Sequence, residues 1–517
     1  MKTILPFKPF FCHKVLPLTY DDSLSYYEIL CKLVHSLNLT IENVNELGAD
    51  FQKLYDFVIN YFDNLDLQEE IDNTIDRLIE SGEFWVYFKS IIGFVTPTMY
   101  GALGDGINDD TDAFIDCYAD ASTLGLNVKI FKGTYSLPSV EPTILSQDTR
   151  TECLDQVILQ LNSSIQLYNS EWYGGHIMCG TTGFILQSGK NKVEKAIVDV
   201  AGGNGISCQY GTGIIEDCTI TNTYNAVMGI WSDADNGVNN QYVLQVHNCR
   251  INDFRKNGIF TSAKACDIAY NILDGNHTDT EPYGGGQIDV VGKQTQGYTT
   301  VRNNIIQNGG ADVTSGIELD WSGNAEIFGN VINVGTSHLY GVVLQNASTA
   351  SVHDNTIIGD GESGSAIACT GDDSDRNILR THNNWLFNCY HNVLITNQVS
   401  VVSLDEERFT GDLIYSTGTH RPIIDVNNGY MWEGTLEANA GCNFYVSGQH
   451  NLKFVVQRTV HVDGQPDNYV TDVLVDADND FVVTSSQSPD FTFADNILTY
   501  GNNTLGQTVL VKVMTVN

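Results

Sequence analysis

The middle of the chain repeats, and this repeat limits the possible folds more than any other feature. A small or polar residue followed by a branched apolar one recurs at spacings of 24, 29, 29, 29, 25, 25 and 26 residues. The pairs are Gly205-Ile206, Gly229-Ile230, Gly258-Ile259, Gln287-Ile288, Gly316-Ile317, Gly341-Val342, Ala366-Ile367 and Asn392-Val393. One coil of a parallel β-helix takes about this many residues, and each coil covers the apolar face of the next. The sequence therefore predicts a mainly β fold built on a right-handed parallel β-helix.

A second position repeats within each coil. It is occupied by Cys218, Cys249, Asn271, Asn304, Asn330, Asn355 and Asn384, each with Ile or Leu two residues later. An asparagine at a repeated turn can pass side-chain hydrogen bonds from coil to coil, which satisfies buried polar groups. We therefore expect an asparagine ladder at one corner of the β-helix.

The chain divides into three predicted parts. Residues 1–95 begin with an extended, proline-containing arm and continue as helices. Residues 96–402 form the β-helix, with 96–140 as its opening segment. After Ser403 the repeat is lost, and short alternating strands predict a β-sandwich-like C-terminal domain over 403–517.

The helical part carries a heptad pattern. Apolar residues recur at steps of 3 and 4 at Val44, Leu47, Phe51, Leu54, Val58, Tyr61 and Leu65. Such a seam indicates helix self-association in a coiled coil, and we expect a trimer. A helical hairpin packed on itself is the alternative.

Charge and cysteine content exclude several classes of function. The formal net charge of −37 repels nucleic-acid phosphates and anionic membranes, so neither is an expected partner. The 12 cysteines show no zinc-type spacing and fit buried small residues made in a reducing cytosol. Pro6 and Pro9 interrupt the N-terminus, which makes a poor signal peptide, and no run reaches transmembrane length. We expect no cofactor.

Two stretches resemble a known family. The run Tyr100-Gly-Ala-Leu-Gly-Asp-Gly-Ile-Asn-Asp-Asp-Thr-Asp-Ala-Phe114 contains Asp109, Asp110 and Thr111 as N-caps for a helix from about Asp112 to Leu124, and strands follow up to Tyr135. This run resembles the opening of pectate-lyase-type β-helices in phage tailspikes and appendages. The stretch from Leu5 to Ser25 is similar to the virion-attachment end of appendage proteins from phages of Gram-positive hosts. The resemblance implies a virion protein made in the host cytoplasm, attached through its N-terminal segment and binding a bacterial surface glycan.

Strand alternation assigns side chains to the two faces of each coil. We call the small or polar residue of each repeated pair the first anchor. The outward side chains two residues after it are Trp231, Phe260, Asp289, Glu318, Val343 and Ala368 on successive coils. Those four residues after it are Asp233, Ser262, Val291, Asp320, Gln345 and Thr370. Neighbouring coils lie about 4.8 Å apart. Asp289 and Glu318 should therefore stack, with Asp320 beside them and Trp321 following.

Three carboxylates flanked by aromatic rings suit glycoside hydrolysis. Like charges at close range raise the pKa of one carboxyl, which leaves a protonated acid beside an ionised base or nucleophile. We therefore predict Asp289, Glu318 and Asp320 as catalytic residues. Trp231, Phe260, Trp321, Asp233 and the loop residue Tyr283 are the predicted sugar-binding residues.

Other interpretations of these residues stay open. Acidic side chains on an outward face can be merely solvated, or they can bind calcium. A polysaccharide lyase would need a basic residue, and Lys264 and Lys293 occupy equivalent places on adjacent coils. A non-catalytic adhesin with the same fold is the other alternative, and the loop that holds Tyr283 can be a plain variable loop. The sequence thus favours a trimeric phage spike that binds and hydrolyses a host surface glycan, either capsule or wall teichoic acid or polysaccharide.

Overall fold

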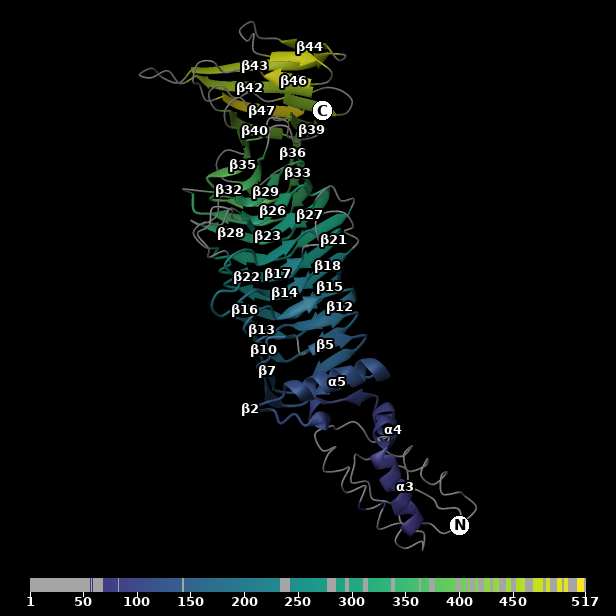
Figure 1. The fold of residues 1–517 in the computed structure, drawn as a ribbon. Helices are drawn as coiled ribbons and strands as arrows, with labels where there is room; N and C mark the ends of the chain where they lie inside the picture. Colours follow the sequence, from purple (N-terminus) through teal and green to yellow (C-terminus); the bar gives the residue numbers. More distant parts are fainter. Residues whose placement is uncertain are drawn as a thin grey trace, which may run out of the picture.

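A computed structural model of the chain describes most of its central region. The structure describes residues 68–396, with the exception of 82, 142–143, 233–241, 277–284, 293–296, 310–314, 336–339, 362–363 and 372–376. It also describes positions 56 and 58 and the backbone of the strands beyond residue 400. These strands wind into a long solenoid, with helices at one end and antiparallel strands at the other (Figure 1).

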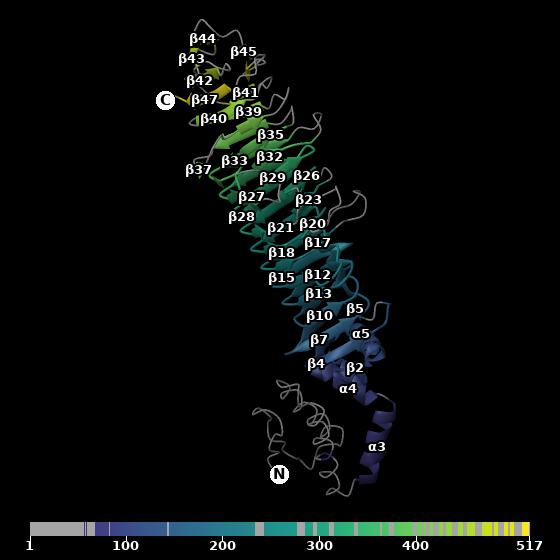
Figure 2. The same ribbon diagram turned by 90° about the vertical axis from the view of Figure 1, so that its left-hand side faces the viewer.

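Each coil contributes one strand to each of three parallel sheets, which run the length of the solenoid (Figure 2). Sheet I contains β1 (Phe94–Val95), β3 (Asn127–Ile130), β6 (Arg150–Cys153), β9 (Glu171–Tyr173), β12 (Gly189–Glu194), β15 (Gly211–Glu216), β18 (Val243–His247), β21 (Ala265–Ala269), β24 (Tyr298–Arg302), β27 (Asn324–Phe328), β30 (Thr349–His353), β33 (Ile378–His382), β36 (Val401–Asp405), β39 (Ile423–Asn427) and β41 (Asn443–Ser447). Sheet II contains β2 (Asp105–Asp109), β4 (Gly133–Leu137), β7 (Val157–Leu161), β10 (His176–Cys179), β13 (Ile197–Val200), β16 (Thr219–Asn222), β19 (Arg250–Asn252), β22 (Ile272–Asp274), β25 (Ile305–Gln307), β28 (Val331–Gly335), β31 (Thr356–Gly359), β34 (Trp385–Phe387) and β37 (Arg408–Phe409). Sheet III contains β5 (Ile144–Gln147), β8 (Ile165–Tyr168), β11 (Phe184–Leu186), β14 (Asn204–Cys208), β17 (Met228–Ser232), β20 (Ile259–Thr261), β23 (Gly286–Val291), β26 (Ser315–Asp320), β29 (Tyr340–Gln345), β32 (Ser365–Cys369), β35 (His391–Ile395), β38 (Ile414–Ser416) and β40 (Met431–Leu436). The predicted parallel β-helix is confirmed.

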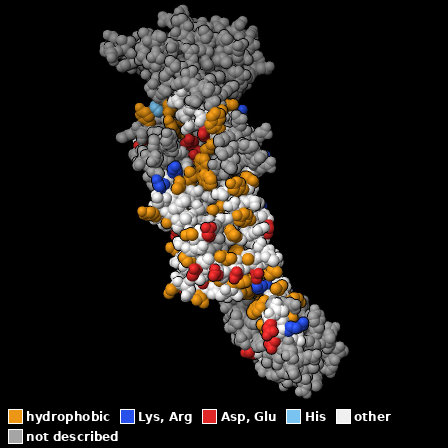
Figure 3. Space-filling model, viewed as in Figure 1, with side chains coloured by type: hydrophobic (Ala, Val, Ile, Leu, Met, Phe, Trp, Pro, Cys, Tyr) orange, Lys and Arg blue, Asp and Glu red, His pale blue; other side chains and the backbone are white. Residues whose placement is uncertain are grey.

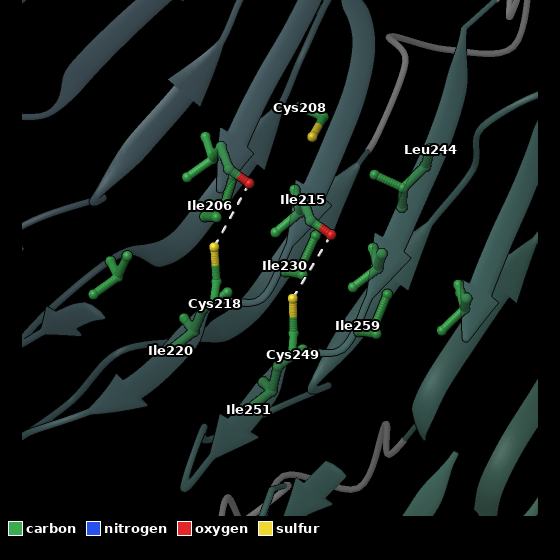
Figure 4. Packing of buried hydrophobic residues seen from close by; sticks show 14 of the residues in the cluster. Ile206, Cys208, Ile215, Cys218, Ile220, Ile230, Leu244, Cys249, Ile251 and Ile259 are labelled. Atoms are coloured by element: carbon green, nitrogen blue, oxygen red, sulfur yellow. Dashed lines mark hydrogen bonds between the residues drawn. The ribbon is translucent and has the colours of Figure 1, made fainter. Parts of the chain in front are cut away.

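The interior is a continuous apolar stack. Ile206, Ile230 and Ile259 occupy the same place on successive coils and are fully buried (Figure 4). Cys218 and Cys249 lie on neighbouring coils, and their thiols point at the backbone carbonyls of Val193 and Ile215 at 3.6 and 3.7 Å. All nine cysteines of the described segments are buried and free, as the scattered spacing predicts. Burial of these apolar side chains is the main stabilising contribution to such a fold.

The asparagine ladder is also confirmed. Asn304 shows its pattern: Nδ2 donates to the carbonyl of Ile268 at 3.0 Å and to Oδ1 of Asn330 at 2.9 Å, while Oδ1 accepts from the amide of Asn271 at 2.9 Å. The same exchange continues to Asn355 and then to Asn384. From Cys249 to Asn355, the buried backbone amide at each turn of this corner therefore donates to the asparagine of the next coil.

The opening segment begins the first coil. Helix α5 (Thr111–Leu124) agrees with the predicted helix, but its capping differs. The Asp110 carboxylate accepts from the amides of Leu103 and Gly104 at 2.7 and 3.3 Å and makes no cap bond to the helix, because the preceding turn folds back over it. Asp109 accepts from the amide of Thr111 at 2.9 Å. The carboxylates of Asp109 and Asp110 thus hold the turn that precedes the helix.

Both ends of the solenoid bear on the predicted domain division. Helices α3 (Gln68–Glu80) and α4 (Glu83–Ile92) and the short 3₁₀ helix η2 (Pro97–Tyr100) precede the first coil, and the predicted heptad seam lies almost wholly outside the described residues. Parallel pairing continues past residue 403 as far as β41, although the sequence repeat is lost there. Antiparallel pairs then join β42 (Leu452–Val460), β43 (Asn468–Ala477), β44 (Asp480–Val483), β45 (Phe491–Ala494), β46 (Ile497–Tyr500) and β47 (Val509–Thr515). The boundary at 403 and the sandwich-like form stay predictions.

Candidate active site

The outward column of sheet III has the predicted register. Trp231 pairs with Phe260, Phe260 with Asp289, and Asp289 with Glu318, each on the next coil. Val291 pairs with Asp320, so the third carboxylate lies one outward position further along β26. The carboxylates lie at mid-length of the solenoid, on strands β23 and β26 (Figure 1).

Asp289 has an unusual environment for an outward-facing carboxyl. Only 8% of the residue is exposed, and its Oδ1 has no hydrogen-bond partner within the described part of the chain. Its Oδ2 accepts from Nδ2 of Asn257 at 3.4 Å. Burial, and then the charges of Glu318 and Asp320, raise the pKa of Asp289 well above its usual range. This carboxyl is therefore set up to hold a proton.

Glu318 is as little exposed as Asp289, at 8%, but it is surrounded by donors. The Ser315 hydroxyl donates to Oε2 at 3.4 Å, and Nε2 of Gln345 donates to Oε1 at 3.1 Å. Hydrogen bonds to both oxygens favour the ionised form of a carboxyl. Burial, together with the charge of Glu318, also raises the pKa of the Tyr340 phenol. The two adjacent acids are thus equally buried but differ in the hydrogen bonds that their oxygens accept.

Asp320 is more open than the other two acids. Nδ2 of Asn346 donates to its Oδ1 at 2.7 Å. Trp321, the next residue, turns the chain with a positive φ of 55° and is 36% exposed. The strand therefore ends with a carboxylate beside an exposed indole, as the sequence predicts.

Two glycines let the backbone approach the acids closely. A Cβ on Gly285 would lie 2.6 Å from Oδ2 of Asp289 and 2.7 Å from Nδ2 of Asn257. A Cβ on Gly286 would lie 2.8 Å from Oγ of Ser315 and 2.9 Å from the amide of Glu318. Any side chain at either position would displace the groups that surround the two carboxyls.

Two of the predicted sugar-binding residues lie where they were expected. Trp231 and Phe260 are half-buried on the two coils that precede Asp289. Asp233 and Tyr283 lie outside the described residues, so their roles stay predictions. Beyond Glu318 the column becomes apolar, with Val343, Ala368 and Leu394 forming a small buried cluster on the same face.

Sequence reasoning missed the residues that contact the acids. Asn257, Gly286, Ser315 and Tyr340 occupy one position, immediately before the first anchor, on four successive coils. The repeat itself could have shown this third column, because it uses the same register. The contacts they make could not be predicted from residue type alone.

The calcium and lyase alternatives depend on clustered ligands and on basic side chains near the acids. Among the described residues, no group of three His, Cys, Asp or Glu side chains is arranged to hold a metal ion. Lys264 is exposed, and Lys293 lies outside the described residues. The described helices include none that is long and apolar enough to cross a bilayer. On the face in Figure 3, acidic side chains appear at several levels of the solenoid with few Lys or Arg between them.

Comparisons with known proteins support the resemblance to phage appendage proteins. The preneck appendage protein of Bacillus phage PZA is 31% identical over 106 residues, which are 20% of this chain and 12% of that protein. The pre-neck appendage protein of Bacillus phage phi29 matches to the same extent. The chain resembles phage pre-neck appendage proteins. The match spans about an eighth of the relatives' length, and no model of a known protein family matches.

Solved structures of similar shape include phage tailspikes and a bacterial adhesin. The Dettilon tailspike protein has a TM-score of 0.48 and 12% identity, covering 82% of this chain and 94% of that chain. A tailspike of E. coli bacteriophage HK620 has a TM-score of 0.43 and 10% identity, covering 83% and 94%. PfbA, a surface adhesin of Streptococcus pneumoniae, has a TM-score of 0.33 and 12% identity, covering 76% and 99%.

Proposed function

We propose that the chain is the subunit of a phage spike or appendage that binds a host surface glycan and hydrolyses it. The observation that carries the enzymatic part is the contrast between Asp289 and Glu318. They are equally buried neighbours on adjacent strands, yet Oδ1 of Asp289 has no described partner, whereas Glu318 accepts a hydrogen bond at each oxygen. A protonated acid beside an ionised carboxylate is the arrangement that glycoside hydrolysis needs.

In the proposed reaction Asp289 gives its proton to the glycosidic oxygen as the bond to the anomeric carbon breaks. An ionised carboxylate then attacks that carbon, or takes a proton from a water that attacks it. Asp289 with Glu318 suits the first route, and the diagonal from Asp289 to Asp320 suits the second. In both routes one water is consumed, its hydroxyl ends on the anomeric carbon, and Asp289 is reprotonated. The stereochemistry of the product separates the two routes.

The charge of the chain favours a neutral or cationic sugar. The chain carries a net charge of −37, which repels a strongly anionic polymer. Trp231, Phe260 and Trp321 offer aromatic faces to sugar rings. We propose capsular polysaccharide or decorated wall polymer as the substrate class.

Amide substitutions test this proposal. Asp289→Asn and Glu318→Gln should each abolish the release of reducing ends from purified host wall polysaccharide, and Asp320→Asn should reduce or abolish it. Asp199→Asn is the matched control, because Asp199 lies on sheet II and pairs with His176 at 2.7 Å. Unchanged activity in all three site variants would overturn the proposed site. Saturable binding of wild type without soluble fragments would indicate an adhesin, and a product absorbing in the near ultraviolet would indicate a lyase.

The assembly is also proposed. We expect a homotrimer whose N-terminal residues 1–95 attach it to other virion proteins. Light scattering of the purified chain should give three times the 56.9 kDa monomer mass. A monomer across a wide concentration range would contradict this part alone.

A further inference from the structure

We propose that Asn257 is a positioning residue that fixes the proton of Asp289 on Oδ1, the buried oxygen without a described partner. This inference rests on the proposed function for its catalytic meaning, but its geometry stands independently. Asn257 is buried on the coil before Asp289, in the column immediately preceding the first anchor.

The orientation of the Asn257 amide is fixed by the backbone. Its Nδ2 donates to the carbonyl of Gly286 at 2.6 Å. A carbonyl only accepts, so the nitrogen and not the oxygen of the amide must lie on this side. The same nitrogen has a second hydrogen, and it is this nitrogen that lies 3.4 Å from Oδ2 of Asp289.

This second contact decides which carboxyl oxygen carries the proton. Oδ2 faces an N–H donor, so a proton on Oδ2 would oppose another hydrogen. Oδ1 has no described partner, so the proton of a neutral Asp289 belongs there. A buried hydroxyl without an acceptor is costly, and a ligand oxygen that accepts from it would remove that cost. A glycosidic oxygen is an uncharged acceptor of this kind.

The close packing around this contact leaves no substitute for Asn257. The Cα of Gly285 lies so near that a Cβ there would stand 2.7 Å from Nδ2 of Asn257 and 2.6 Å from Oδ2 of Asp289. Removal of the Asn257 amide should therefore leave Oδ2 without its donor.

The contact between Nδ2 of Asn257 and Oδ2 of Asp289 predicts the direction in which the pKa of Asp289 changes when the amide is removed. A donor to Oδ2 stabilises the ionised carboxyl and lowers the pKa of Asp289, although burial and the neighbouring charges outweigh it. Asn257→Ala should therefore raise the pH at which Asp289 loses its proton. If Asp289 is the general acid, the alkaline limb of activity should move upward by about half a pH unit while the maximal rate falls.

Infrared spectroscopy measures the proton directly, without activity. The wild-type chain should show a protonated-carboxyl band at neutral pH that Asp289→Asn lacks. Its titration midpoint should move upward in Asn257→Ala. Asn257→Asp retains the side-chain shape and should move the midpoint further, because it adds a carboxyl, and it serves if the alanine variant folds poorly. Asn276→Ala is the matched control, since Asn276 is a buried amide that donates to the carbonyl of Ile251 at 3.0 Å.

The outcomes separate the two proposals. A midpoint that stays in place in both Asn257 variants would show that Asn257 is only structural. A midpoint that moves in the Asn257 variants, without any cleavage by wild type, would retain the positioning role and reject the hydrolase. An upward shift of the same size in Asn276→Ala would also overturn the inference, because it would trace the effect to general loosening of the coil.

Discussion

Replacement of Asp289 by asparagine should make the protein more stable at neutral pH while it removes activity. Asp289 is buried, its Oδ1 has no described partner, and its pKa in the folded state lies well above the ordinary value of 3.8. Asparagine has the shape of the protonated carboxyl but cannot ionise. The variant therefore removes the cost of the charge and leaves the packing unchanged.

The size of the effect follows from proton linkage. Because the folded-state pKa is raised, the contribution of Asp289 to stability is fully present below pH 3.8 and is lost as pH rises through the folded-state pKa. Over that window the free energy of unfolding of wild type should fall, relative to Asp289→Asn, by about 1.4 kcal/mol per pH unit. Above the folded-state pKa the difference should become constant.

Urea unfolding of both proteins between pH 3 and about pH 8, followed by circular dichroism, measures this difference. Hydrogen exchange of peptides from β23 and β26 shows whether the effect is local. Asp199→Asn, which removes a carboxyl that faces His176 at 2.7 Å, should show no such gain. Parallel pH profiles for wild type and Asp289→Asn, or a variant that is less stable at neutral pH, would refute the reasoning.

Three further substitutions test other parts of the structure. Asn304→Ala removes the donor to the carbonyl of Ile268 and the acceptor for the amide of Asn271, so the free energy of unfolding in urea should fall by about 3–5 kcal/mol. As the control, Asn333→Ala at an exposed position should change the free energy of unfolding by less than about 0.5 kcal/mol. Gly286→Ala should lower the rate of glycan cleavage by about 10²-fold with the solenoid intact by circular dichroism, because its Cβ would lie 2.9 Å from the amide of Glu318; wild-type rates would contradict this. Trp231→Ala should weaken glycan binding by about tenfold in calorimetry, and an unchanged affinity would place the sugar elsewhere.

The sequence predicts the solenoid and the position of the acids well, because both depend on one periodicity. A repeated anchor fixes the register, and strand alternation then fixes the face of every residue around it. Asp289 and Glu318 could therefore be paired across 29 residues of sequence, and they do pair in the structure. The asparagine ladder was predictable for the same reason.

The environment of the acids could not be predicted in this way. The burial of Asp289 and the donors Ser315 and Gln345 depend on side-chain contacts between coils, which residue type and spacing do not determine. The same holds for Asp110, whose carboxylate binds the preceding turn although its position before a helix suggested a cap. Local sequence signals a helix start, but tertiary contacts decide which amides reach the carboxylate.

The uneven coil length has an evolutionary consequence. Anchors are separated by 24 to 29 residues, yet the three sheets keep their pairing from coil to coil. Insertions between strands are therefore tolerated, whereas a single residue added within β23 would turn Asp289 inward. Duplication or loss of an entire coil would lengthen or shorten the spike without disturbing any column. Lineages that descend from this chain should therefore differ by whole coils and by turns, with the acids moving along the axis as an intact unit.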